Sequence, residues 1–235
     1  MNKMFTTAMA IAAVAGLASA DISTTAGYKE VSVTGSDFIG TPFANYEDSE
    51  AAATLGDIIG QSGDSIKVIS AGGKTLFTAT YGTSPSAGWY DGAGCSNAFP
   101  LARGTSVHFT ANGDSSTLFM AGSLATNDTV TVNLGAQNNF VANASPFSAK
   151  TLGNFVVSGA GYKPMGSDYF FVNGQKVVYL DQATAAKAKL AAGWYLKDAL
   201  KNPATAVSQN GLEIPVGKGF RCVLKTGATI TVPGK

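Results

Sequence analysis

The sequence has little of the chemistry that most enzymes and metalloproteins use. It contains one histidine, His108, and two cysteines, so neither a histidine-dependent triad nor a four-ligand zinc site is expected. Charged residues make up 13% of the chain and the net charge is +1, which provides no electrostatic footprint for nucleic acid. After the N-terminal segment no apolar run reaches the roughly 18 residues of a membrane-spanning helix. We therefore expect a protein without catalytic activity, metal, cofactor or transmembrane span.

The carboxylates are scattered along the chain, and most lie next to glycine or in expected turns. This placement favours a role in capping turns. A glycosidase needs two carboxylates on opposite sides of one bond, so a polysaccharide-active enzyme is kept only as a distant alternative. The residues concerned are Asp37, Asp57, Asp64, Asp91, Asp114, Asp168, Asp181 and Glu213.

Residues 1–20 have the features of a secretory signal peptide. Lys3 supplies the positive charge, an apolar stretch follows, and Ala18-Ser19-Ala20 matches a cleavage site before Asp21. The alternative is a buried N-terminal helix. The sequence therefore predicts an extracytoplasmic protein, in the periplasm, at the cell surface or secreted.

The chain contains two series of similar segments in the same order, which predicts a tandem duplication. We expect a first β-unit over residues 21–124 and a second over residues 125–235. The matched segments are Val31–Phe38 with Val130–Gly135 and Phe140, Pro42-Phe43 with Pro146-Phe147, Thr54–Asp57 with Thr151–Asn154, Ala87–Tyr90 with Ala192–Tyr195, and Pro100–Gly104 with Pro215–Gly219.

Most of the chain is typical of short strands separated by glycine and asparagine turns, as in the expected hairpins 65–81 and 169–180. We expect an all-β protein of two sandwich-like or barrel-like units packed together. Residues 181–190 have helical spacing and predict a short helix in the second unit. Residues 48–53 predict a helical turn in the first. Gly104 and Gly219 each precede a strand, which predicts a tight bend or a positive φ angle at both.

The two cysteines, Cys95 and Cys222, do not occupy matching positions in the two units. In an oxidising compartment they can form a disulfide between the units. The alternative is a buried free thiol at Cys222, on the inner face of the expected strand 220–224. The same alignment places His108 opposite Val223, which favours a position on a strand face over a catalytic role.

Each unit contains an adjacent aromatic pair, Trp89-Tyr90 and Trp194-Tyr195. Flat aromatic side chains on a β-surface can stack on sugar rings or on another protein. Alternatively, because adjacent strand residues face opposite sides, one member of each pair belongs to the core. These four residues are the candidate ligand-binding residues.

The export signal, the Gly-Trp-Tyr segments and the Pro-x-x-x-Gly segments resemble those of internally repeated β-proteins that bacteria export. This resemblance implies no activity and no site residues. It agrees with an exported, duplicated β-protein.

The expected function is that of a non-catalytic structural or interaction protein of the cell envelope or exterior. The alternative is a carbohydrate-binding module that uses the Trp/Tyr pairs. Partners are then other envelope components, a second copy of the chain, or glycan. Strands 117–120 and 229–232 carry no charged residue to guard an edge, so we expect at least one to pair with another chain or to be covered within the molecule.

Overall fold

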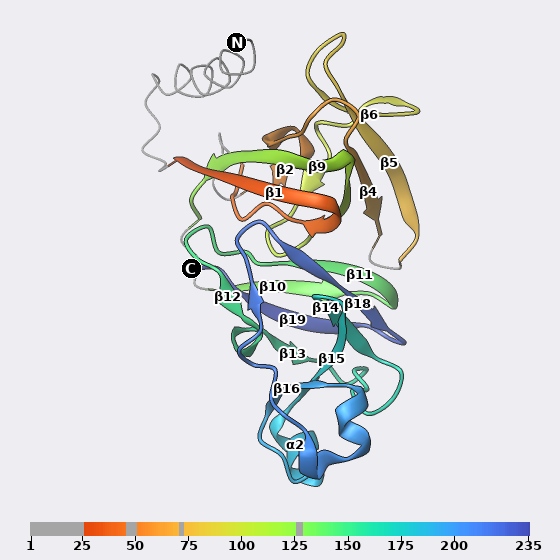
Figure 1. Cartoon of the computed structure of the whole chain (residues 1–235), viewed down its shortest axis with the longest axis vertical. Coiled ribbons are helices and arrows are strands. Elements are labelled where there is room, and N and C mark those ends of the chain that lie inside the picture. The colour runs from red at the N-terminus through yellow and green to blue at the C-terminus, as the bar shows by residue number, and fades with distance from the viewer. Residues whose placement is uncertain (1–25, 46–50, 71–72, 126–128) are drawn as a thin grey trace.

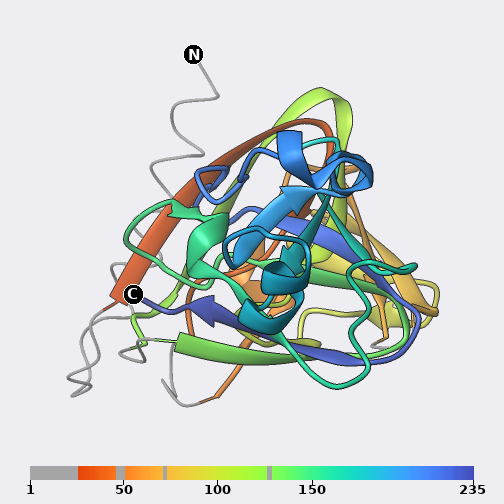
Figure 2. The same cartoon turned by 90° about the horizontal axis from the view of Figure 1, so that it is seen from below.

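The computed structural model describes residues 26–45, 51–70, 73–125 and 129–235, and these residues form an all-β protein. The predicted signal peptide lies outside the described residues. We refer to residues 26–125 as the N-terminal half and to residues 129–235 as the C-terminal half. The two halves are stacked along the long axis of the molecule (Figures 1 and 2). In the described part of the chain no helix is long and apolar enough to cross a membrane.

The N-terminal half is built around one antiparallel sheet with the order β1-β9-β4-β5-β6-β7, in which β3 also pairs with β9. A two-stranded sheet, β2-β8, and the 3-10 helix η1 complete it. The elements are β1 (Ala26–Ile39), β2 (Ala53–Thr54), η1 (Leu55–Asp57), β3 (Ile58–Ile59), β4 (Ser65–Ile69), β5 (Thr75–Gly82), β6 (Gly88–Asp91), β7 (Gly94–Cys95), β8 (Pro100–Leu101) and β9 (Val107–Ser123).

The C-terminal half has a five-stranded sheet, β11-β18-β14-β15-β16, a three-stranded sheet, β10-β19-β13, and a two-stranded sheet, β12-β17. The strands are β10 (Thr129–Leu134), β11 (Gln137–Ala142), β12 (Lys150–Thr151), β13 (Val156–Ser158), β14 (Tyr169–Val172), β15 (Gln175–Leu180), β16 (Gly193–Leu196), β17 (Glu213–Ile214), β18 (Gly219–Leu224) and β19 (Ala228–Pro233). The helices are η2 (Leu152–Asn154), α2 (Gln182–Lys187), η3 (Asp198–Lys201) and η4 (Pro203–Thr205).

Both halves contain the same arrangement around a buried tryptophan. The indole Nε1 of Trp89 donates to the carbonyl of Ile58 at 2.8 Å, and that of Trp194 donates to the carbonyl of Phe155 at 2.9 Å. An asparagine side chain accepts a hydrogen bond from each tryptophan backbone N–H: Asn97 in the N-terminal half and Asn210 in the C-terminal half. Each tryptophan lies in a separate hydrophobic core.

The 3-10 helices before these cores begin in the same way. The side chain of Asp57 accepts a hydrogen bond from Thr54 N at 2.7 Å, and that of Asn154 accepts one from Thr151 N at 3.1 Å. A side chain that satisfies a free backbone donor at a helix start stabilises that start. The two Thr-Leu-Gly-Asp/Asn segments therefore adopt one local structure.

The halves differ in how their long strands are divided. In the N-terminal half β1 and β9 are continuous, and their register shifts between Thr34 and Ser36, where Gly35 has a φ angle of 64°. Such a bulge bends a strand pair without interrupting it. In the C-terminal half the corresponding pairing is divided between β10-β19 and β11-β18, which belong to two sheets.

Backbone hydrogen bonds cross between the halves in a reciprocal pattern. Gly40 N donates to the carbonyl of Gly217 at 3.2 Å, and Ala142 N donates to the carbonyl of Gly104 at 2.8 Å. Gly104 and Gly217 have φ angles of 81° and 76°, in the left-handed region that favours glycine. The two glycine turns thus present their carbonyl groups to the opposite half.

Each half also sends a cationic side chain into the other. Arg103 donates to the backbone carbonyls of Ala144 and Gly234 at 2.8 and 2.9 Å. In the opposite direction, Lys218 Nζ lies 2.7 Å from the carboxylate of Asp37 and donates to the carbonyl of Ser32. These contacts hold the halves in one arrangement.

Several sequence expectations concern single elements. Both predicted hairpins are confirmed, as β4-β5 and β14-β15. The predicted helix over 181–190 is confirmed but ends at Lys187, and the Asp181 side chain caps its start by accepting from Thr184 N. Of the helical turn expected over 48–53, residues 48–50 lie outside the described residues, and the rest is not helical, because Ala52 pairs with Ala44 and Ala53 belongs to β2.

The expectation of a positive φ angle is correct for Gly104 and wrong for Gly219. In the C-terminal half the positive φ angle occurs two residues earlier, at Gly217. Gly219 is needed for a different reason, because a Cβ atom there would clash with the carbonyl oxygen of Val141. The close approach of β11 and β18, two strands of the C-terminal half, therefore requires the absence of a side chain.

The expectation for the two uncharged strands is met by coverage within the molecule. Residues 117–120 belong to β9, where all four pair with β1 and where Phe119 and Met120 also pair with β3. Residues 229–232 belong to β19, between β10 and β13. Neither segment is a free sheet edge.

Candidate functional site

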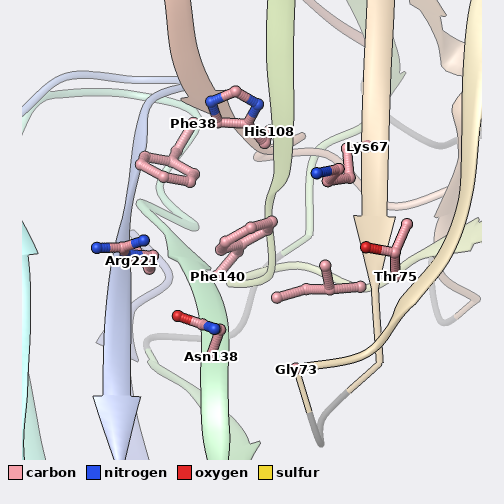
Figure 3. A pocket seen from close by; sticks show the side chains of 9 residues that line it. Phe38, Lys67, Gly73, Thr75, His108, Asn138, Phe140 and Arg221 are labelled. Carbon is pink, nitrogen blue, oxygen red and sulfur yellow. The ribbon is translucent and has the colours of Figure 1, made fainter.

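A groove of about 350 Å³ lies at the junction between the halves and is the best candidate for a functional site (Figure 3). Strands β1, β4 and β9 contribute from the N-terminal half, and β11 and β18 contribute from the C-terminal half. We call it the basic-aromatic groove. The side chains that give it its character are Phe38, Lys67, His108, Asn138, Phe140 and Arg221.

Two phenylalanines, one from each half, meet in this groove. The ring centroids of Phe38 on β1 and Phe140 on β11 are 4.8 Å apart, with the planes tilted by 52°. Both side chains are half-buried. Phe38 pairs across the strands with His108, and Phe140 pairs in the same way with Arg221. Each half therefore contributes a phenylalanine opposite a basic residue.

Two cationic side chains, Lys67 and Arg221, line this groove, and no carboxylate is among its described lining residues. Lys67 is exposed, whereas His108 and Arg221 are half-buried. The nearby carboxylate of Asp37 is bound by Lys218 and accepts a hydrogen bond from Phe38 N. Lys67 has no carboxylate partner in the described part of the chain.

Arg221 is held in place by an aromatic ring while one of its donors is left unused. Its guanidinium carbon lies 5.6 Å from the ring centroid of Phe171 on β14, a cation–π contact. Its Nε atom is buried and lacks a hydrogen-bond partner. A buried donor without an acceptor is costly, so Arg221 keeps an unsatisfied polar atom inside the protein.

The groove environment disfavours a proton on His108. Burial of the ring and the positive charges of Lys67 and Arg221 lower the pKa of His108, and Asp37 acts in the opposite direction. The imidazole is therefore neutral at pH 7. Its ring packs edge-on against Phe38 at 5.3 Å, which makes it part of the aromatic surface.

The four candidate aromatic residues do not form this site. Trp89 and Trp194 have no exposed surface, and both indole N–H groups are used within the core, so neither ring can stack on a ligand. Tyr195 is also buried and donates to the carbonyl of Ala191. Tyr90 is half-buried and donates to the carbonyl of Ser86. At least one member of each pair therefore belongs to the core, as in the alternative interpretation, and only Tyr90 of the four is partly exposed.

The two cysteines are both free thiols, so the structure does not contain the Cys95–Cys222 disulfide. Cys95 is exposed on β7, the outermost strand of its sheet, whereas Cys222 is fully buried on β18. Burial raises the pKa of Cys222 to about 12, which leaves the thiol unreactive. The two side chains belong to regions that do not meet.

The buried carboxylates support turns, as the sequence indicates. Asp64 accepts hydrogen bonds from Gln61 N and Asn112 N, both at 2.8 Å. Asp168 accepts from Lys163 N at 2.7 Å and from Lys225 N at 2.8 Å. Among the described residues no three histidine, cysteine or acidic side chains form a group that could hold a metal ion.

Sequence reasoning missed the groove because its alignment of the halves was two residues out of register here. The backbone N–H of Thr105 donates to the carbonyl of Ala102 in one turn, and the backbone N–H of Lys218 donates to the carbonyl of Pro215 in the other. These equivalent hydrogen bonds match Thr105 with Lys218. His108 therefore corresponds to Arg221 and not to Val223. The sequence contained one sign of the groove. Phe38 and Phe140 occupy matched positions in the two halves, and each pairs with a strand that carries a basic residue.

Comparisons of the chain with protein families, with curated proteins and with solved structures found no match.

Proposed function

We propose that this chain is an exported, non-catalytic interaction protein of the cell envelope or exterior, and that it binds through the basic-aromatic groove. The observation that carries the proposal is the pair of cations, Lys67 and Arg221, beside an exposed part of the Phe38–Phe140 pair. Neither cation has a carboxylate partner in the described part of the chain. Partly exposed aromatic groups together with arginine are typical of binding surfaces.

We also propose that the halves descend from one duplicated unit. The support is the set of matched hydrogen bonds around Trp89 and Trp194 and the matched starts of η1 and η2. Under this proposal the groove combines two copies of one strand pair. One copy carries His108 and the other carries Arg221, so the two copies have diverged at the binding surface.

Assembly with a second copy of the chain has less support. The two uncharged strands that favoured it are both paired within the molecule. Envelope components are therefore the partners that we propose. Export rests on the N-terminal segment and is tested by sequencing the N-terminus of the native protein, which should begin at Asp21 in an extracytoplasmic fraction. A native protein that retains residues 1–20 in the cytoplasm would contradict export.

The interaction itself is tested by cosedimentation of the mature protein with isolated cell envelopes of the producing organism. The wild type should sediment with the envelopes. The double variant Lys67→Gln/Arg221→Gln should remain in the supernatant, because both cations of the groove are removed. Raised salt should also weaken the wild-type interaction, since exposed charges are screened.

The matched control is Lys187→Gln/Lys189→Gln, which removes the same charge at exposed positions on and just after α2. This control should sediment as the wild type does. Thermal melting of all variants checks that they fold. The proposal is wrong if the wild type does not sediment, or if the groove variant and the control behave alike.

A further inference from the structure

We infer that the basic-aromatic groove binds an acidic oligosaccharide, a chain of sugars that carries carboxylate groups. This inference rests on the proposed function and specifies its ligand. It places glycan recognition at the junction between the halves and not at the Trp/Tyr pairs, whose tryptophans are buried.

Charge is the first argument for this ligand. Lys67 and Arg221 line the groove together, and no acidic side chain is among its described lining residues. The guanidinium of arginine offers paired donors that match a carboxylate. A neutral sugar would leave both charges without a counterion.

The aromatic surface is the second argument. In Figure 3, Phe38 and Phe140 lie between Arg221 on β18 and Lys67 on β4. The C–H groups on one face of a pyranose ring are apolar and pack on such a surface, as apolar groups do on aromatic rings. A small inorganic anion would make no use of it. The groove thus suits a ligand with both an apolar face and negative charge.

Polar side chains at the rim complete the match. In Figure 3, Asn138 lies beside Phe140 and Thr75 lies near Lys67, and both can exchange hydrogen bonds with sugar hydroxyls. The cations lie on opposite sides of the rings in Figure 3, so carboxylates on different sugars of one chain can reach both. A nucleic acid is disfavoured because the net charge of the chain is only +1.

The test is isothermal titration calorimetry of the full mature protein with trigalacturonic acid as the probe. The acidic trisaccharide should bind, and the neutral trisaccharide maltotriose should not. Lys67→Gln and Arg221→Gln should each weaken binding by about tenfold, the expected loss for one charge-assisted contact. Lys187→Gln on α2 should bind as the wild type does. Because Lys67 is exposed, that variant tests the inference even if Arg221→Gln fails to fold.

Three results would overturn the inference: no binding of trigalacturonic acid, equal binding of maltotriose, or equal affinity in the Lys67→Gln variant. Acetate that displaces the trisaccharide at equal concentration would show a simple anion site and would also overturn it. If the protein still sediments with envelopes through Lys67 and Arg221 while trigalacturonic acid does not bind, the inference fails and the proposed function stands. If neither binding is seen, both fail.

Discussion

At the scale of single residues, each tryptophan fills a core with its ring while its indole N–H forms a buried hydrogen bond. Each indole N–H reaches a backbone carbonyl, of Ile58 or of Phe155, at the end of a 3-10 helix. A buried indole without such a partner would leave its donor unsatisfied. The two tryptophans are thus core elements of each half.

We expect Trp89→Phe and Trp194→Phe each to lower the free energy of unfolding by about 2–4 kcal/mol, because a carbonyl loses its donor and a cavity remains. Urea denaturation measures this. The control Tyr90→Phe removes a hydrogen bond at the surface and should change stability by about 0.5 kcal/mol or less. Wild-type midpoints for both tryptophan variants would contradict this account of the cores.

The cysteines give a second prediction at this scale. Under native conditions without reductant, one thiol per chain, that of Cys95, should react with Ellman's reagent, because burial keeps Cys222 protonated and inaccessible. Both thiols should react after denaturation. A chain with no reactive thiol in either condition would instead contain the disulfide that the structure lacks.

At the scale of elements, the sequence predicts local structure better than register. The two hairpins and the short helix after Asp181 follow from local sequence patterns, so they are recognisable without the rest of the chain. To predict the groove from the sequence, Pro100–Gly104 had to be aligned correctly with the matching residues of the C-terminal half. Gly219 has the same spacing from a proline as Gly104, whereas the positive φ angle and the turn hydrogen bond match Gly104 with Gly217.

These two glycines make the register testable. Gly219→Ala should destabilise the protein by about 1–3 kcal/mol, because a methyl group would meet the rigid carbonyl of Val141 in the other strand. Gly217→Ala should cost about 1 kcal/mol or more through its positive φ angle. Gly211→Ala, at an exposed position with open space around its Cβ, is the matched control and should be neutral. Thermal melting that shows no loss for Gly219→Ala would contradict the close approach of β11 and β18.

At the scale of the whole molecule, the junction between the halves unites structure and proposed function. Reciprocal backbone hydrogen bonds and the side chains of Arg103 and Lys218 hold the halves together. The same contact brings Phe38 and Phe140 to one place and leaves a groove beside them. This site was beyond the sequence because its residues come from strands of both halves, and only their packing joins them.

The most direct test of the central claim is hydrogen–deuterium exchange of the mature protein, free and bound to isolated cell envelopes, read by mass spectrometry. The account predicts slower exchange on binding in peptides from the groove, above all in β11, which lies at the edge of its sheet, and in the residues that follow β4. Peptides from α2 and from β6–β7 should exchange as in the free protein. Slower exchange confined to α2 or β6–β7, with the groove peptides unchanged, would contradict the claim that the protein binds through the junction of its halves.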